Sequence, residues 1–96
     1  MTPEPSPEQL RLATIETLLD EAARMQRVAT HVTMQEQINH AVRDLEDALQ
    51  CLRDAPVAEH PNTELFVALA IGRASWRLQL VDATLQAAGP DASLEI

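Results

Sequence analysis

The chain has 96 residues, a formal net charge of −8 and 46% apolar residues, which suits one globular domain. Phe66 and Trp76 are its only aromatic residues, so the core must be aliphatic. An acidic surface repels phosphate backbones, and no lysine is present for Schiff-base chemistry or for a phosphate-binding loop. The composition therefore excludes these two lysine chemistries and makes a nucleic-acid partner unexpected.

The cysteine content, the N-terminal residues and the apolar runs bear on cellular location. Cys51 is the single cysteine, so no disulfide can form within the chain, which is typical of a reducing compartment. The first residues, MTPEPSPEQ, lack the basic and apolar regions of a signal peptide. The longest strongly apolar run, Leu65 to Ile71, is too short to span a bilayer. We expect a cytoplasmic protein that does not enter the membrane.

The first predicted element is a helix over about residues 6–30, after a disordered segment at 1–5. Ser6 is a typical capping residue, Pro7 suits the first helical position, and Gln9 completes a capping box. Apolar residues then recur at helical spacing: Leu12, Ile15, Leu18, Leu19, Ala22, Met25 and Ala29.

A second helix is predicted over about residues 33–55. Its apolar residues step by four and three positions, at Ile38, Val42, Leu45, Leu49 and Leu52. At about 100° per residue, this stripe points away from that of the first helix, so one straight helix could not bury both. Thr33 and Glu36 form a T-x-x-E pattern that predicts a new helix start, with the break between Thr30 and Thr33.

The third helix is predicted over about residues 62–88, after a proline-containing loop at 54–62. Asn62 or Thr63 is the expected cap, and Gly89 followed by Pro90 is a stop signal. Residues 89–96 are expected to form a C-terminal tail whose last residues, DASLEI at 91–96, are frayed. These elements predict an all-α fold, either a three-helix bundle or a helical hairpin extended by a third helix.

The third helix is apolar on two opposite sides. One stripe contains Val67, Ala70, Ile71, Ala74, Leu78, Val81, Leu85 and Ala88, and the other contains Leu65, Leu69, Gly72, Trp76 and Leu80. A helix of this kind lies at the centre of a bundle or in an interface. Trp76 is either core, covered by the first helix, or an interface anchor. We expect the second stripe to form an interface, and the chain to self-associate, most simply as a dimer.

Arg73 and Arg77 lie between the two stripes and are included in the expected interface. As like charges four positions apart they repel one another when left alone. Salt bridges to acids of the first or second helix are the simpler interpretation, and a clamp for an acidic partner is the functional one.

The second helix carries residue types that bind metals. Glu36, His40, Asp44 and Asp47 share one face, with Cys51 near its edge and Asp54 beyond. A solvated helix face collects the same residues, and the E-x-x-H pair of di-iron bundles is missing. We therefore expect no metal and no cofactor.

The sequence does not show a pair of catalytic groups. The serines are Ser6, Ser75 and Ser93, and none has a recognisable base beside it in the sequence. His31 falls in the turn between the first two helices and His60 in the proline loop. We expect that the protein is not an enzyme.

Three functions remain open from the sequence. The first is a small acidic protein that binds and modulates another protein, as a regulator, antiactivator, immunity protein or inhibitor does. The second is a bundle that binds a metal or small ligand on the acidic face of the second helix. The third is an acidic mimic of nucleic acid, which fifteen acids diluted by seven arginines favour least.

Overall fold

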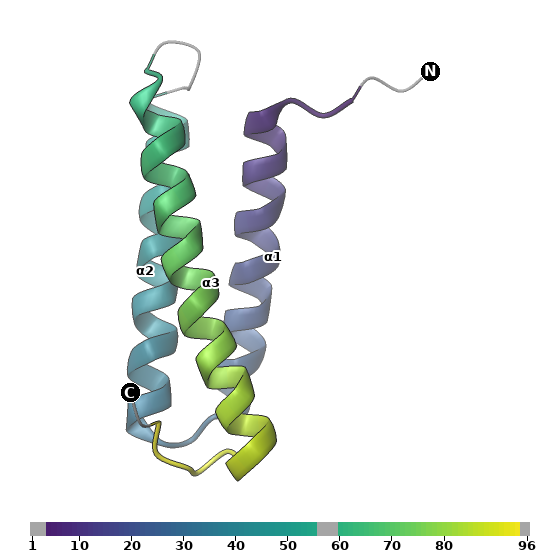
Figure 1. Cartoon of the computed structure of the whole chain (residues 1–96), viewed down its shortest axis with the longest axis vertical. Helices are drawn as coiled ribbons and strands as arrows, with labels where there is room; N and C mark the ends of the chain where they lie inside the picture. Colours follow the sequence, from purple (N-terminus) through teal and green to yellow (C-terminus); the bar gives the residue numbers. More distant parts are fainter. Residues whose placement is uncertain (1–3, 56–59, 95–96) are drawn as a thin grey trace.

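The computed structural model describes residues 4–55 and 60–94, and its described part is an antiparallel bundle of three helices. These are α1 (Pro7–Val28), α2 (Val32–Asp54) and α3 (Asn62–Ala88). The chain runs down α1, up α2 and down α3, so that α1 and α3 point the same way (Figure 1). The predicted all-α three-helix bundle is confirmed. The expected disorder at 1–5 and the loop at 54–62 fall largely on residues 1–3 and 56–59, outside the described ranges.

The start of α1 follows from local side-chain chemistry. The hydroxyl of Ser6 accepts a hydrogen bond from the backbone N–H of Gln9 at 3.2 Å, and the side-chain oxygen of Gln9 accepts one from the N–H of Ser6 at 2.9 Å. Pro7 occupies the first turn, where its missing N–H has no cost. The predicted capping box is therefore present in full.

The chain turns between α1 and α2, as the opposed apolar stripes require, but the cap of α2 was predicted wrongly. The capping residue is His31, whose Nδ1 accepts a hydrogen bond from the N–H of Thr33 at 3.1 Å. Helix α2 thus begins at Val32, and Thr33 already lies inside it. The T-x-x-E pattern predicted the wrong cap because an imidazole nitrogen can accept a hydrogen bond from the first turn of a helix, as a serine or threonine oxygen does.

The core is formed mainly where α2 and α3 pack against each other. Small and aliphatic side chains alternate there, and those of α2 are Met34, Ile38, Ala41, Leu45, Ala48 and Leu52. They meet Val67, Ala70, Ile71, Ala74, Leu78 and Val81 of α3. Helix α1 adds Ile15, Ala22 and Met25, followed by Ala29 just beyond its end. No aromatic side chain takes part in this core among the described residues.

Helix α3 has an unexpected beginning and the expected end. The capping position is Pro61 and no side-chain capping bond is present, so neither Asn62 nor Thr63 acts as the cap. The N–H of Thr63 instead bonds the backbone oxygen of His60 at 2.9 Å, and the Thr63 side chain is buried. The helix ends at Ala88, and Gly89 follows with a φ of 94°, a conformation that favours glycine.

Residues 91–94, which were expected to be frayed, are held against the bundle through Leu94. The backbone oxygen of Pro90 accepts hydrogen bonds from the N–H of Thr30 at 2.7 Å and from its hydroxyl at 3.0 Å. The hydroxyl of Thr33 accepts from the N–H of Leu94 at 2.7 Å, and the Leu94 side chain is buried in the core. The tail therefore closes the end of the bundle where α1 turns into α2 (Figure 1).

We expect Thr33→Ala to lower the free energy of unfolding by about 1 kcal/mol, because the Leu94 N–H loses its acceptor. In a chain that stops after Asp91, the same substitution should lower the free energy of unfolding by only about 0.3 kcal/mol, because the Leu94 N–H is already absent. Urea denaturation of the four proteins measures both costs. Equal losses in the two backgrounds would mean that Thr33 acts within α2 and not through the tail.

Candidate protein-interaction surface on α3

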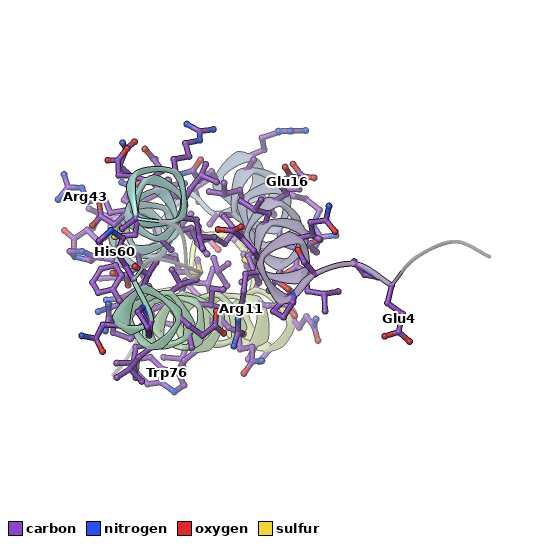
Figure 2. All side chains as sticks on the ribbon, turned by 90° about the horizontal axis from the view of Figure 1, so that it is seen from above. Glu4, Arg11, Glu16, Arg43, His60 and Trp76 are labelled. Carbon is purple, nitrogen blue, oxygen red and sulfur yellow. The ribbon has the colours of Figure 1, made fainter. Side chains whose placement is uncertain are left out.

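The second apolar stripe of α3 is exposed to solvent. Leu65 is 63% exposed, Leu69 55% and Trp76 53%. Trp76 points away from both other helices, on the far side of α3 (Figure 2). Helix α1 packs against the opposite side of α3 and does not cover this stripe. Within one chain, therefore, Trp76 is not a core residue.

Gly72 lies in the middle of this exposed stripe. Apart from the adjoining residues and the local backbone of α3, a Cβ atom built at Gly72 would have no heavy atom within 4 Å, so no neighbouring element of the described chain requires a glycine there. A glycine inside a helix costs about 1 kcal/mol relative to alanine. Nothing within the single chain compensates for that cost.

Two members of the surface differ from the sequence expectation. Leu80 is only partly exposed and packs against the core, so it lies at the margin of the stripe. Phe66, which the stripe pattern missed, is 42% exposed. Phe66 does not belong to the stripe of α3 that was predicted to enter the core, and this pattern could have indicated its exposure. We refer to Leu65, Phe66, Leu69, Gly72 and Trp76 as the α3 outer face.

The α3 outer face is large enough to be an interaction site. Aromatic side chains present roughly 150–250 Å² each, so Phe66 and Trp76 at about half exposure leave roughly 200 Å² of mostly apolar surface. The exposed parts of Leu65 and Leu69 add to this area. Contiguous patches of about this size on single chains are often functional. Both aromatic residues of the protein are exposed on α3, with Trp76 in the stripe and Phe66 at its flank.

The two arginines of α3 turn toward α2. Arg73 lies 3.6 Å from the carboxylate of Asp44, and its side chain remains half exposed. Arg77 donates a hydrogen bond to the side-chain oxygen of Gln37, an amide and not an acid. The expected pair of salt bridges is therefore half correct. Arg73 retains exposed surface beside the α3 outer face, whereas Arg77 is engaged within the bundle.

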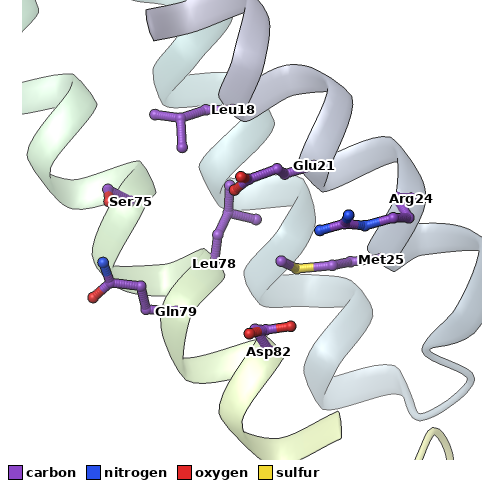
Figure 3. Close-up of a pocket in the computed structure, with 8 residues that line it drawn as sticks. All are labelled: Leu18, Glu21, Arg24, Met25, Ser75, Leu78, Gln79 and Asp82. Carbon is purple, nitrogen blue, oxygen red and sulfur yellow. The ribbon is translucent and has the colours of Figure 1, made fainter. Parts of the chain in front are cut away.

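A groove of about 300 Å³ lies between α1 and α3, where Gln79 separates it from the α3 outer face (Figure 3). Glu21, Arg24 and Met25 line it from α1, and Ser75, Gln79 and Asp82 line it from α3. No histidine or cysteine lines the groove, so Ser75 has no imidazole beside it to activate its hydroxyl. The groove thus lacks the paired nucleophile and base of an acyl-transfer site.

The acidic face of α2 remains a set of separate side chains. Glu36, His40 and Asp47 are exposed, while Asp44 is partly buried beside Arg73. Within residues 4–55 and 60–94, no three His, Cys, Asp or Glu side chains are close enough to share a metal ion. His31 uses its Nδ1 to cap α2, and His60 is exposed before α3.

No model of a known protein family matches this chain, and no curated protein or solved structure matches it either. None of the helices in the described part is long and apolar enough to cross a membrane.

We expect Gly72→Ala to raise the free energy of unfolding by about 1 kcal/mol at protein concentrations where single chains predominate. The added methyl group enters open space and the helix gains propensity. Gly89→Ala is the matched control and should destabilise by about 1–2 kcal/mol, because its φ of 94° is unfavourable for alanine. Chemical denaturation measures both. A loss at Gly72 would reveal a close contact inside the single chain.

We expect zinc to bind more weakly than about 1 µM and to leave the melting temperature unchanged, because ligand-type residues on one exposed helix face offer too few donors in fixed geometry. Thermal unfolding with stoichiometric zinc, after purification without chelator, measures this. A large rise in melting temperature that disappears in His40→Ala would contradict the expectation.

Proposed function

We propose that this protein is a non-catalytic interaction module that binds and modulates a protein partner through the α3 outer face. The observation that carries this proposal is the placement of the aromatic residues. A chain with only two aromatics gains most by burying them, yet Phe66 and Trp76 both lie on the surface of one helix. A partner that covers them supplies the missing burial.

The chemistry of the face favours a polypeptide partner. Tryptophan is enriched among the residues that dominate binding energy, and leucines around it exclude water from the contact. Burying the exposed parts of Leu65, Leu69 and Trp76 would contribute several kcal/mol, at about 25 cal/mol per Å² of apolar surface. A long, straight, apolar helix face fits the apolar face of another amphipathic helix.

A protein with this function belongs to the class of small acidic regulators, which includes antiactivators, immunity proteins and inhibitors. Such a protein acts by occupying a surface of its target, so it needs no catalytic group. The unpaired Cys51 is compatible with action in the cytoplasm. No comparable arrangement supports metal or ligand binding on α2.

The test compares two leucines of equal exposure. Leu69→Glu should abolish capture of protein partners from the native host, because it places a charge in the centre of the α3 outer face. Leu10→Glu changes the net charge equally at a leucine of α1 that is 54% exposed, and should leave capture intact. Quantitative mass spectrometry of the captured proteins measures the difference, and circular dichroism confirms that both variants stay helical.

Partners captured equally by wild-type protein and both variants would place the binding site elsewhere on the molecule. Partners lost equally with both variants would show that added negative charge, and not the α3 outer face, governs binding. Either result would overturn the proposed site.

A further inference from the structure

We propose that the α3 outer face binds a second copy of this chain, with the two α3 helices antiparallel and Leu69 of each copy opposite Gly72 of the other. This inference rests on the proposed function, because it names a partner for the same face. It makes the free protein a symmetric dimer in which each copy uses the identical surface, as two-fold symmetry requires.

The spacing of the face is that of a helix-pairing seam. Its positions alternate steps of three and four residues: Asn62, Leu65, Leu69, Gly72, Trp76 and Gln79. A repeat of this kind averages 3.5 residues and keeps one seam against a partner helix at a shallow crossing angle. The solvent-exposed seam residues lie opposite the stripe that enters the core. The seam therefore remains available after the bundle has formed.

The seam complements itself only when the helices run in opposite directions. In that arrangement Leu69 faces Gly72 of the second copy, and Leu65 faces Trp76 of the second copy. Each contact then joins a large side chain to a small one or a leucine to the tryptophan. Asn62 and Gln79 face each other at both ends, where paired amides close the apolar contacts with hydrogen bonds. A parallel arrangement would place Gly72 against Gly72 and leave a gap.

The open space at Gly72 gives this arrangement its physical basis. Apart from the adjoining residues and the local backbone of α3, no atom of the described chain lies within 4 Å of a Cβ built there. A leucine from a second copy fits against the bare backbone and brings the two helices close together. The glycine, unexplained within one chain, is then required by the contact between two.

The distribution of charge also favours pairing through the α3 outer face. Each copy carries a net charge of −8, so two copies repel one another over most of their surfaces. Between Leu65 and Val81 the helix contains no acid, and its only charges are Arg73 and Arg77. The antiparallel arrangement also brings the exposed part of Arg73 near Phe66 of the second copy, where a guanidinium stacks favourably on an aromatic ring.

The area is sufficient for a specific dimer. The apolar side chains of the two faces together with the flanking polar residues bury roughly 1,000 Å², which is about the lower limit for a biological interface. An interface at this limit dissociates on dilution. The dimer should therefore be in measurable equilibrium with single chains.

Sedimentation equilibrium of the purified full chain tests the pairing. The average mass should rise from one chain toward two with increasing concentration. Leu69→Glu should weaken the association by about 100-fold or more, as loss of a central contact does. Leu10→Glu, equal in charge and in original exposure, should leave it within about two-fold. A wild-type chain of constant single-chain mass overturns the dimer, and equal weakening by both variants overturns pairing through the α3 outer face.

Disulfide formation between two variants tests the arrangement. Asn62→Cys and Gln79→Cys, each in a Cys51→Ala background, keep every apolar residue of the α3 outer face. Mixed together under mild oxidation they should form a mixed disulfide, which differently sized tags identify, whereas each variant alone should form none. Disulfides within each variant alone would show parallel pairing, and no disulfide in the mixture would exclude the register.

The outcomes separate this inference from the proposed function. A chain that stays single but loses its captured partner through Leu69→Glu keeps the proposed function and ends the dimer. A chain that dimerises as described, with no captured partner that depends on Leu69, keeps the dimer and ends the proposal of a target protein at this face.

Discussion

The close packing of α2 against α3 is the interaction on which the rest of the structure depends. Both helices place alanines in the contact, with Ala41 and Ala48 on one side and Ala70 and Ala74 on the other, all fully buried. Small side chains let the helix backbones approach, and the leucines, isoleucines and valines between them fill the space at the density of a protein interior. Helix α1 adds fewer buried side chains and is joined to α3 by the 2.7 Å ion pair of Arg11 with Glu64.

This packing explains why the bulky residues of α3 lie outside. The inward side of α3 is occupied by alanines and aliphatic side chains that already match α2, and Trp76 sits on the opposite side of the helix. A tryptophan in the place of Ala74 would overfill a contact built for small residues. The remaining apolar side chains of α3 therefore point outward. One side of α3 lies in the core and the opposite side is exposed to solvent.

The far end of the bundle is closed by the chain's own C-terminal part. Pro90 and Leu94 satisfy polar groups of the α1–α2 turn and cover the adjacent end of the core. One chain of bonds runs from the N–H of Leu94 to the hydroxyl of Thr33, which lies 2.9 Å from Nδ1 of His31, the cap of α2. The stability of the turn is thus coupled to residues about 60 positions further along the chain.

The sequence by itself determined the three helices, the turn between opposed stripes, the capping box at Ser6 and the two apolar sides of α3. These features follow from periodicity and from contacts within a few residues, which a sequence displays directly. It gave the wrong caps for α2 and α3 and predicted fraying for residues 91–94, which are held in place. The cap of α2 is an imidazole nitrogen, α3 has no side-chain cap, and Leu94 is held by Thr33, which lies far from it along the chain. Only the tertiary structure decided that Trp76 is exposed and that neither α1 nor α2 packs against Gly72. A periodic pattern shows that a helix has two apolar sides but not which of them the other helices cover.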